Sequence, residues 1–464
     1  MNEALHPIII QMQPGEEQLP AVTARGFDVA VTAGAGAGKT RTLVARYLAL
    51  LAEGAPLRAA VAITYTRKAA REMRNRVREA VRRYLETPGL AAAERTYWQE
   101  LAAGLDAARI STIHSLCAEI LRHHPAEAAI DPRFELLDEG QQALLQRQAV
   151  DAALGRATDD PQTVRLFGDF GESELRKGLR TLLQRRLDVE STRQKLPADL
   201  WSLWEAQVTP PIRAFVTDPE VQLAFAELRG LVDGGMLAQA LAAGDAFAPL
   251  LPEILARWEA IQAAQTSGDW VTVSQQLYPL RAVLRQVGKK EHWKSGDPKP
   301  LVKTVQGRFD TCLGSWGKQP FDLALDREVA RDVLPALLAL YDIARAIYSQ
   351  AKASRRALDF DDLEAGALQL LESHPAVRVY WQNTISALLV DEFQDTNARQ
   401  RDLLQALNGD AGKIFVVGDG KQSIYRFRGA DVTVFRDVWE DISRRGQTLT
   451  LATLFREHTA LTES

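Results

Sequence analysis

Short apolar runs bounded by polar or turn-forming residues predict four buried strands in this chain. They cover residues 28–32, 59–64, 385–390 and 413–417, and each is too short for a helix. Helical patterns lie between and after them, for example over residues 40–51 and 68–85. This alternation predicts an α/β fold in which helices cover both faces of a parallel sheet. Ligands of such sheets bind beyond the carboxyl ends of the strands.

The stretch from about residue 125 to residue 357 has a different pattern. It is rich in Ala, Leu, Arg and Gln, its periodicity is helical, and it contains no convincing strand. A segment rich in Gly, Pro and Lys at 288–300 predicts a loop inside it. We therefore expect a large helical insertion that splits the α/β domain in two.

Composition narrows the class of protein. The 464 residues are 46% hydrophobic and 25% charged, and the net charge of -4 means that any nucleic-acid site must be a local patch. Two cysteines, Cys117 and Cys312, argue against a disulfide framework and for a reducing compartment. The sequence has no recognisable signal peptide or membrane-spanning run. The expected location is the cytoplasm, without a membrane partner.

A glycine-rich segment after the first strand predicts a phosphate-binding loop. Glycines let backbone N–H groups approach phosphate closely, and the following helix N-terminus adds a positive dipole. Lys39 is expected to reach the β- and γ-phosphates of ATP, and Thr40 is expected to hold Mg²⁺. A glycine-rich turn that binds nothing is the alternative, which the Gly-Lys-Thr run disfavours. The loop consists of Ala33, Gly34, Ala35, Gly36, Ala37, Gly38, Lys39 and Thr40.

An acidic pair follows the third predicted strand. Asp391 and Glu392 come directly after an apolar run, at the carboxyl end of the strand. Asp391 is expected to bind Mg²⁺, directly or through water, and Glu392 to orient and deprotonate the attacking water. An isolated Asp-Glu pair is usually only solvated, but its combination with a phosphate-binding loop favours ATP hydrolysis.

Further segments recur in the order found in one helicase family. They lie at residues 14–18, 62–70, 111–117, 359–363, 417–430 and 451–456. Together with the two ATP segments they resemble superfamily 1A helicases of the UvrD/Rep type, especially the AddA/RecB branch, over residues 11–124 and 359–464. The resemblance implies that Gln18 reads the adenine edge and that Arg41 packs on the base.

The resemblance also implies DNA contacts near the second predicted strand. Tyr65 is implied as a stacking face for single-stranded DNA, and Thr112 and His114 as contacts to its backbone. Residues 58–83 carry nine Lys or Arg against two Glu, which favours a phosphate-tracking patch over a solvated helix face. For His114, a structural hydrogen bond is an equal alternative. Residues 359–363 are implied mainly to hold the junction with the insertion.

Two downstream segments carry further residues of the implied motor. Gln422 matches the family's γ-phosphate sensor. Tyr425, Phe427 and Arg428 match residues that face DNA, with Phe427 stacking on a base; a core position is the alternative for these aromatic rings. Arg456 matches the arginine that reaches the γ-phosphate across the interdomain cleft, although its neighbours depart from the usual pattern.

The length of the insertion fits the AddA/RecB branch better than compact UvrD-type members. The loop expected at 288–300 is basic and carries one aromatic side chain, Trp293. Contact with duplex DNA ahead of the motor is one interpretation of this loop, and a solvated loop is the other.

The expected domains follow from the pattern and the resemblance. Residues 1–124 and 358–450 are expected to form a RecA-like ATP-binding domain, residues 125–357 a helical insertion, and residues 451–464 the start of a second motor domain. Because family members continue well beyond the position of Arg456, we expect a truncated motor.

The implied function is an ATP- and Mg²⁺-dependent DNA helicase or translocase. The resemblance implies 3′-to-5′ movement on single-stranded DNA, action at duplex ends in recombinational repair of double-strand breaks, and a second nuclease/helicase subunit of the AddB type. The alternative is a truncated module that binds ATP and DNA with little hydrolysis of its own. A small-molecule P-loop kinase would explain Lys39 and Asp391, but not Gln18 at its spacing.

Overall fold

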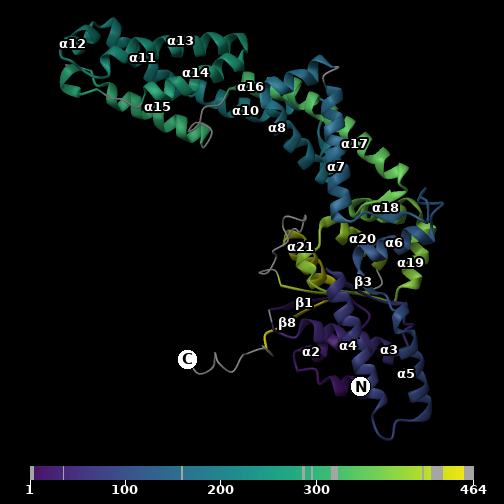
Figure 1. Cartoon of the computed structure of the whole chain (residues 1–464). Coiled ribbons are helices and arrows are strands. Elements are labelled where there is room, and N and C mark those ends of the chain that lie inside the picture. The colour runs from purple at the N-terminus through teal and green to yellow at the C-terminus, as the bar shows by residue number, and fades with distance from the viewer. Residues whose placement is uncertain are drawn as a thin grey trace, which may run out of the picture. The chain divides into compact units, whose positions relative to one another are not determined.

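The chain divides into two units (Figure 1). It is seen here in a computed structural model, which describes residues 5–34, 36–157, 160–284, 288–293, 296–314, 322–409, 412–419 and 432–453. The sheet unit comprises residues 1–143 and 350–464, and the helical unit comprises residues 144–349. The boundaries between the two fall within helices α7 (Glu139–Ala157) and α17 (Leu334–Ser354).

Six parallel strands form the main sheet of the sheet unit, in the order β3-β2-β6-β7-β1-β8. Val29 on β1 lies opposite Phe415 on one side and Gln447 on the other. The predicted α/β class is confirmed, and the four predicted strands lie within two residues of β1, β2, β6 and β7, while β3 and β8 were not predicted. The strands are β1 Val29–Ala33, β2 Ala60–Thr64, β3 Ile110–Thr112, β6 Ala387–Val390, β7 Ile414–Gly418 and β8 Gln447–Leu451.

The central strands of the sheet are buried on both faces, which is why β1, β2, β6 and β7 are nearly continuous apolar runs. Val29 and Val31 pack into one core, and Ala30 between them packs into the other. Helices from the N-terminal part of the chain cover the first face: α1 Pro7–Met12, α2 Gln18–Thr23, α3 Lys39–Ala52, α4 Arg67–Leu85 and α5 Ala92–Gly104. Mainly later helices cover the second: α6 Ile113–His123, α18 Phe360–Ser373, α19 Pro375–Thr384, α20 Ala398–Asn408 and α21 Val432–Arg445.

Side-chain caps fix where several of these helices begin. Thr66, the residue after Tyr65, accepts a hydrogen bond from the backbone N–H of Ala69 and caps the start of α4 at Arg67. Asp359 and Asp362 form a capping box at the start of α18. Lys352 forms ion pairs with both carboxylates, and its Nζ lies 2.9 Å from Oδ2 of the fully buried Asp359. This ion-paired cap is a structural arrangement, as the sequence predicted for residues 359–363.

A second, two-stranded sheet lies next to this junction. Strand β4 (Glu135–Leu136) pairs in parallel with β5 (Ala357–Leu358). The expectation that residues 125–357 contain no strand was therefore wrong at these positions. A strand of two residues is too short to show the alternation of apolar and polar residues that identifies a strand in a sequence.

The helical unit has an aromatic core of its own. Phe225 stacks on Trp258 with ring centroids 4.1 Å apart, and Phe215 meets Phe309 at 4.9 Å. Besides most of α7 and α17, it contains the helices α8 Pro161–Gln184, α9 Arg186–Lys195, α10 Leu200–Val216, α11 Pro219–Asp233, α12 Met236–Ala242, α13 Leu251–Ser267, α14 Trp270–Val283, α15 Pro298–Leu313 and α16 Leu323–Glu328. No helix among the described residues is long and apolar enough to cross a membrane.

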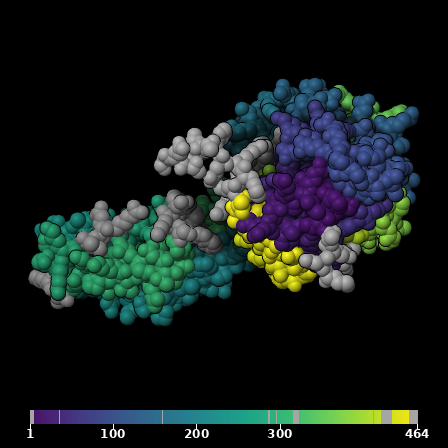
Figure 2. Space-filling view, turned by 90° about the horizontal axis from the view of Figure 1, so that it is seen from below, coloured from purple at the N-terminus to yellow at the C-terminus, as the bar shows by residue number. Residues whose placement is uncertain are grey.

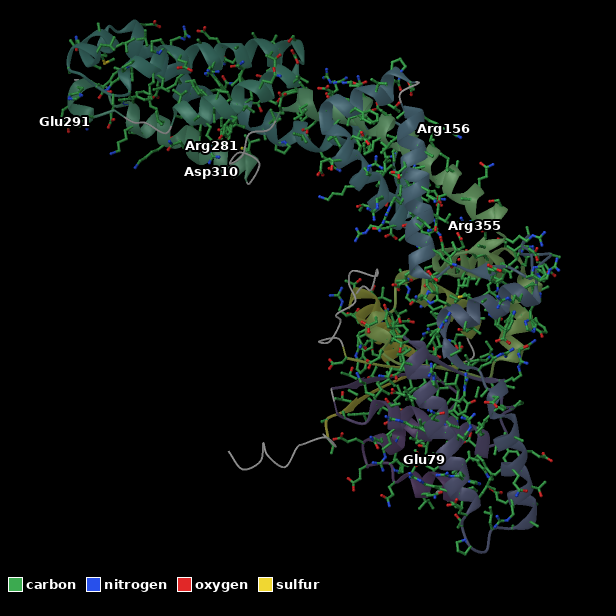
Figure 3. The ribbon with its side chains drawn as sticks, in the orientation of Figure 1. Glu79, Arg156, Arg281, Glu291, Asp310 and Arg355 are labelled. Atoms are coloured by element: carbon green, nitrogen blue, oxygen red, sulfur yellow. The ribbon has the colours of Figure 1, made fainter. Side chains whose placement is uncertain are left out.

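The basic segment at 288–300 differs from the exposed loop that the sequence suggested. A 3₁₀ turn at Lys290–Trp293 interrupts it, and α15 begins at Pro298. The Trp293 ring is completely buried next to Phe247 and is not available at the surface of this segment, whereas contact of the basic segment with duplex DNA stays a prediction. On the surface of the same unit, Arg281 and Asp310 lie side by side and form an ion pair of 2.6 Å (Figure 3).

Candidate functional site

The glycine-rich segment turns from β1 into α3 at the carboxyl edge of the sheet. Gly36 and Gly38 have φ angles of 82° and 80°, which L-residues with a side chain rarely adopt. Gly38 caps α3, and Lys39 is the first residue of that helix, followed by Thr40. Backbone N–H groups at such a helix start suit an anion. Ala35 lies outside the described residues.

The acidic pair follows β6, which is separated from β1 by β7 alone. Nζ of Lys39 lies 2.9 Å from Oε2 of Glu392, so the lysine predicted to bind phosphate and the carboxylate predicted to act as the base form an ion pair. Nε2 of Gln394 donates to the same oxygen at 2.7 Å. Glu392 has a left-handed backbone with φ 51°, a conformation that costs about 1–3 kcal/mol outside glycine. The strained residue is therefore held by two donors.

Carboxylates crowd this edge of the sheet. Burial raises the pKa of Asp391 to about 6, and the charge of Glu392 contributes to the same rise. Burial and the same neighbour raise the pKa of Asp395 to about 6. Oδ1 of Asp395 is buried and has no hydrogen-bond partner among the described residues. Oxygen donors of this kind, with the hydroxyl of Thr40, fit Mg²⁺, and a divalent cation would relieve the repulsion.

The residues expected around the adenine base make internal contacts. Gln18 is almost fully buried; its Oε1 accepts from the N–H of Gly15 at 3.1 Å and its Nε2 donates to the carbonyl of Ala37 at 3.4 Å. The fold thus brings Gln18 against the glycine-rich segment. Arg41 donates to the carbonyl of Met12 at 2.6 Å, on the same N-terminal stretch. Pairing with a base would require Gln18 to exchange at least one of these bonds.

Glu17, which the sequence did not single out, joins the N-terminal stretch to the end of β8. Its Oε2 accepts from the N–H groups of Ala452 at 2.7 Å and Thr453 at 3.1 Å. Those two bonds hold the pKa of Glu17 below its usual range. Figure 2 shows the N-terminal residues (purple) beside the C-terminal strand residues (yellow) on one face of the sheet unit. No local pattern reveals this contact, because its partners lie at opposite ends of the sequence.

The residues implied in DNA contact follow two adjacent strands. Tyr65 comes directly after β2 and Thr112 ends β3, so both lie at the carboxyl edge of the sheet. Thr112 also caps α6, with Oγ1 accepting from the N–H of Ser115 at 3.4 Å. The first turn of α4, next to Tyr65, exposes Arg67 and Lys68.

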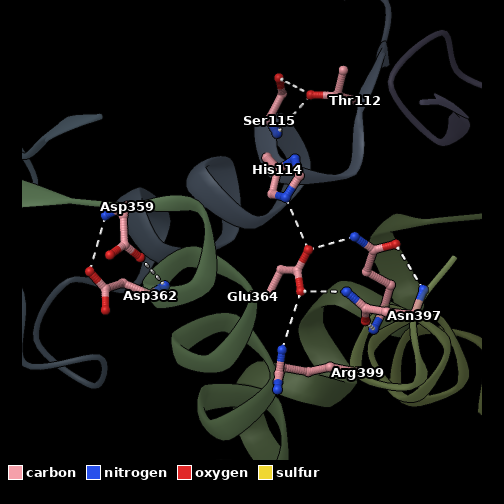
Figure 4. Close-up of polar contacts among 9 residues, drawn as sticks. Thr112, His114, Ser115, Asp359, Asp362, Glu364, Asn397 and Arg399 are labelled. Carbon is pink, nitrogen blue, oxygen red and sulfur yellow. Dashed lines mark hydrogen bonds and ion pairs between the residues drawn. The ribbon is translucent and has the colours of Figure 1, made fainter. Parts of the chain in front are cut away.

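His114 lies in the first turn of α6 and contacts α18. Its Nε2 is 3.0 Å from Oε1 of Glu364 (Figure 4). Its ring centroid is 4.6 Å from that of Phe360. Glu364 was missed from the sequence, although a signal was present. It lies on the same helix face as the buried Ala367 and Leu371, where a carboxylate is unusual.

Several predicted site residues lie outside the described residues. These are Ala35 of the glycine-rich segment, the implied γ-phosphate sensor Gln422, the implied DNA-facing residues Tyr425, Phe427 and Arg428, and the implied cleft arginine Arg456. The strand that leads into residues 420–431 is β7, between β1 and β6. Asp419, the residue after β7, donates its N–H to Oε1 of Gln394 at 3.0 Å.

Comparison with known proteins identifies relatives over nearly the whole chain. An ATP-dependent helicase/nuclease subunit from Limosilactobacillus fermentum is 30% identical over 94% of this chain and 35% of its own length. The protein of the same name from Pelotomaculum thermopropionicum is 30% identical over 95% of this chain and 37% of its own length. That of Latilactobacillus sakei is 28% identical over 95% of this chain and 53% of its own length. The chain thus spans about a third to a half of these relatives.

A family model described as the UvrD/REP helicase N-terminal domain matches residues 15–212 and 337–443, which together exceed half of the chain. The stretch between these two matched regions lies in the helical unit. The match takes in the glycine-rich segment, the acidic pair and the strands that carry them. The chain therefore belongs to the UvrD/REP helicase family.

Proposed function

We propose that this chain is the ATP-binding part of an ATP-dependent DNA helicase or translocase. The ion pair between Lys39 and Glu392 carries the proposal, because it joins the proposed phosphate-binding cation to the proposed general base at the same carboxyl edge of the sheet. The γ-phosphate of ATP lies between two such groups when it is hydrolysed. Lys39 would then exchange Glu392 for phosphate oxygens.

The roles of the remaining groups follow from their chemistry. Thr40 and Asp391 would hold Mg²⁺, which bridges the phosphates and neutralises charge in the transition state. Glu392 would take a proton from the attacking water once Lys39 has moved to the phosphates. Gln18 would read the adenine edge and Arg41 would pack on the base. Gln422 and Arg456 are proposed to act on the γ-phosphate.

Single-stranded DNA is the proposed track. Tyr65, Thr112 and His114 lie at the edge formed by β2 and β3, and the basic helix α4 starts there. Cationic helix faces bind phosphates without sequence preference, and aromatic rings stack on any base. Tyr425, Phe427 and Arg428 are proposed to extend this surface. Movement from 3′ to 5′ and action at duplex ends in double-strand-break repair belong to the same proposal.

The names of the relatives support a partner protein. Each is named as one subunit of a helicase/nuclease, which suggests that a second subunit of the AddB type joins the whole protein. We propose that ATP and Mg²⁺ are the cofactors of the motor and that the nuclease chemistry belongs to other parts of the assembly.

Two substitutions in the purified chain test the ATP site. Lys39→Ala should weaken ATP binding and abolish turnover, because the phosphates lose their cation. Glu392→Gln should keep ATP binding, or strengthen it by releasing Lys39, while turnover falls by about 10²–10⁴-fold. Binding is measured with a fluorescent ATP analogue, and turnover by phosphate release.

Matched exposed residues, Lys303→Ala and Glu372→Gln, serve as controls and should leave both measurements unchanged. Equal loss of binding and turnover in Glu392→Gln would make Glu392 a structural residue. Tight ATP and oligonucleotide binding with negligible turnover in the unmodified chain would favour the alternative function, a binding module with little hydrolysis of its own.

A further inference from the structure

Glu364 is a buried carboxylate for which the proposed ATP chemistry has no use. Its side chain is only 5% exposed. It lies in the first turns of α18, a helix that otherwise buries apolar side chains such as Leu363 and Ala367. A carboxylate in such a position is costly unless several donors satisfy it.

Four donors from two other elements surround this carboxylate (Figure 4). The imidazole of His114, on α6, lies on one side of the carboxylate. Side chains from the start of α20 lie on the other side. The contacts to Glu364 are His114 Nε2 at 3.0 Å, Gln400 Nε2 at 2.5 Å, Asn397 Nδ2 at 3.1 Å and Arg399 Nη1 at 3.5 Å.

These donors come from both candidate sites. His114 belongs to the segment implied in DNA contact, two residues after the end of β3. Asn397 and Gln400 form the capping box of α20, which begins shortly after the acidic pair. Glu364 therefore bonds at once to the candidate DNA edge and to the helix that follows Glu392.

The contacts also determine the orientation of the imidazole. Burial acts to raise the pKa of Glu364, but the hydrogen bond and charge of His114, with bonds from Gln400 and Asn397, hold it below its usual range. An ionised carboxylate only accepts, so Nε2 of His114 must carry the hydrogen. Phe360 packs against the ring, which stays 27% exposed. A protonated His114 can then donate its Nδ1–H to a phosphate oxygen.

We infer that Glu364 is a positioning residue for DNA binding, which holds the His114 ring in the orientation that meets the phosphate backbone and ties it to α20. The inference rests on the proposed function, because it takes single-stranded DNA as the ligand. Glu364 itself touches no DNA in this arrangement, so its effect must pass through His114.

A double-mutant cycle on the full chain tests this dependence. Glu364→Gln keeps the shape of the side chain but removes its charge, and should weaken binding of a fluorescent oligothymidylate roughly five- to tenfold. His114→Ala should cause a similar loss. In the His114→Ala background, Glu364→Gln should add less than about twofold, because the group through which it acts is already gone. Affinity for a fluorescent ATP analogue should stay within about twofold throughout.

Two further variants separate positioning from general loss of stability. Asp28→Asn removes another buried carboxylate of the sheet unit, one bonded to Asn408 and to the N–H of Ile414, and should leave oligonucleotide affinity unchanged. Glu364→Asp retains the charge but shortens the reach, and should give an intermediate loss even where Glu364→Gln does not fold. In the His114→Ala background, Glu364→Asp should leave oligonucleotide affinity unchanged.

Four results would count against these assignments. Equal losses from the Glu364 substitutions with and without His114 would overturn the inference, as would unchanged oligonucleotide affinity in Glu364→Gln or Glu364→Asp. Unchanged affinity in His114→Ala, with ATP and DNA still bound, would overturn the inference but not the proposed function. Failure of the unmodified chain to bind any single-stranded oligonucleotide would overturn the proposed function, and the inference with it.

Discussion

At the scale of single residues, the acidic pair combines local strain with a charge network. Glu392 adopts a left-handed backbone while its side chain accepts from Lys39 and Gln394. Asp391 beside it is pushed toward protonation by burial and by the charge of Glu392. Both features raise the free energy of the nucleotide-free site. Mg²⁺ and ATP would lower this free energy, because Mg²⁺ supplies a cation and ATP draws Lys39 away from Glu392.

The raised pKa of Asp391 predicts a substitution that stabilises the protein. Its folded-state pKa is about 6, above the ordinary value of 3.8, so the folded state binds a proton more tightly than the unfolded chain. Ionisation of Asp391 therefore destabilises the folded state. This loss of stability is complete above pH 6 and vanishes as pH falls toward 4. Asp391→Asn should therefore raise the free energy of unfolding at pH 7.5, without nucleotide, by on the order of 1–2 kcal/mol. Urea denaturation at pH 7.5 and pH 5 measures this, and the gain should shrink at pH 5.

Glu119 provides a control of opposite sign. Burial acts to raise the pKa of Glu119, but hydrogen bonds and charge from Arg109 and Arg58 keep it below its usual value. Its ionised form therefore stabilises the folded state above the ordinary pKa, and this contribution is lost as pH falls through the lowered one. Glu119→Gln should destabilise the protein at pH 7.5. A loss of stability in Asp391→Asn at that pH would contradict the electrostatic account of the acidic pair.

Residue types at the site were predictable, whereas their partners were not. Lys39 and Glu392 each follow an apolar strand, and that context is local in sequence. Their ion pair joins positions 353 residues apart, and the bond between His114 and Glu364 joins positions 250 apart. Such pairings depend on which strands become neighbours, and no periodicity in the sequence encodes that order.

At the scale of elements, buried strands were predictable because burial on both faces leaves a short continuous apolar run. Amphipathic helices were predictable from their helical periodicity. Strand β3 has only three residues, and β8 alternates polar and apolar residues at the edge of the sheet, so neither forms such a run. Helix α4 was predicted from residue 68 and begins at Arg67. Its apolar stripe faces the core, and its many arginines occupy the remaining surface.

Helix α4 predicts that DNA affinity depends on one end of its basic surface. Arg67, Lys68 and Arg71 are exposed in the first turns, beside Tyr65 at the carboxyl edge of the sheet. Changing all three to Glu should weaken oligonucleotide binding by at least tenfold. It should also lower the slope of log affinity against log salt by about 2, because fewer counterions are released. Anisotropy titrations at several salt concentrations measure both.

The other end of the same helix supplies the matched control. Arg82 and Arg83 are also exposed, but they lie roughly 20 Å along the helix from Arg67, at a rise of about 1.5 Å per residue. Changing both to Glu should leave the salt slope nearly unchanged. Equal effects at the two ends would mean that net charge, rather than the edge beside Tyr65, determines binding.

At the scale of the whole molecule, two units with separate cores share one chain. The sheet unit contains both apolar cores of the sheet, and the helical unit contains the cluster around Phe225 and Trp258. The helical character of the long middle segment was predictable from its periodicity. The limits of the unit, within α7 and α17, were not, because both helices continue through the boundary without a break in pattern.

Separate cores predict that ATP will stabilise only one of the units. Every residue proposed to bind nucleotide belongs to the sheet unit. A ligand that binds only the folded form stabilises that form by about 2.7 kcal/mol at a hundredfold excess over its Kd. Calorimetry of the full chain should show two transitions, of which Mg²⁺ and ATP raise one. Hydrogen exchange followed by mass spectrometry should assign it, with added protection in β1, α3 and β6 and none in α13 or α14.

Lys39→Ala should abolish the shift while leaving both transitions present. A single transition that moves as a whole would mean that the two units unfold cooperatively and that nucleotide binding also stabilises the helical unit.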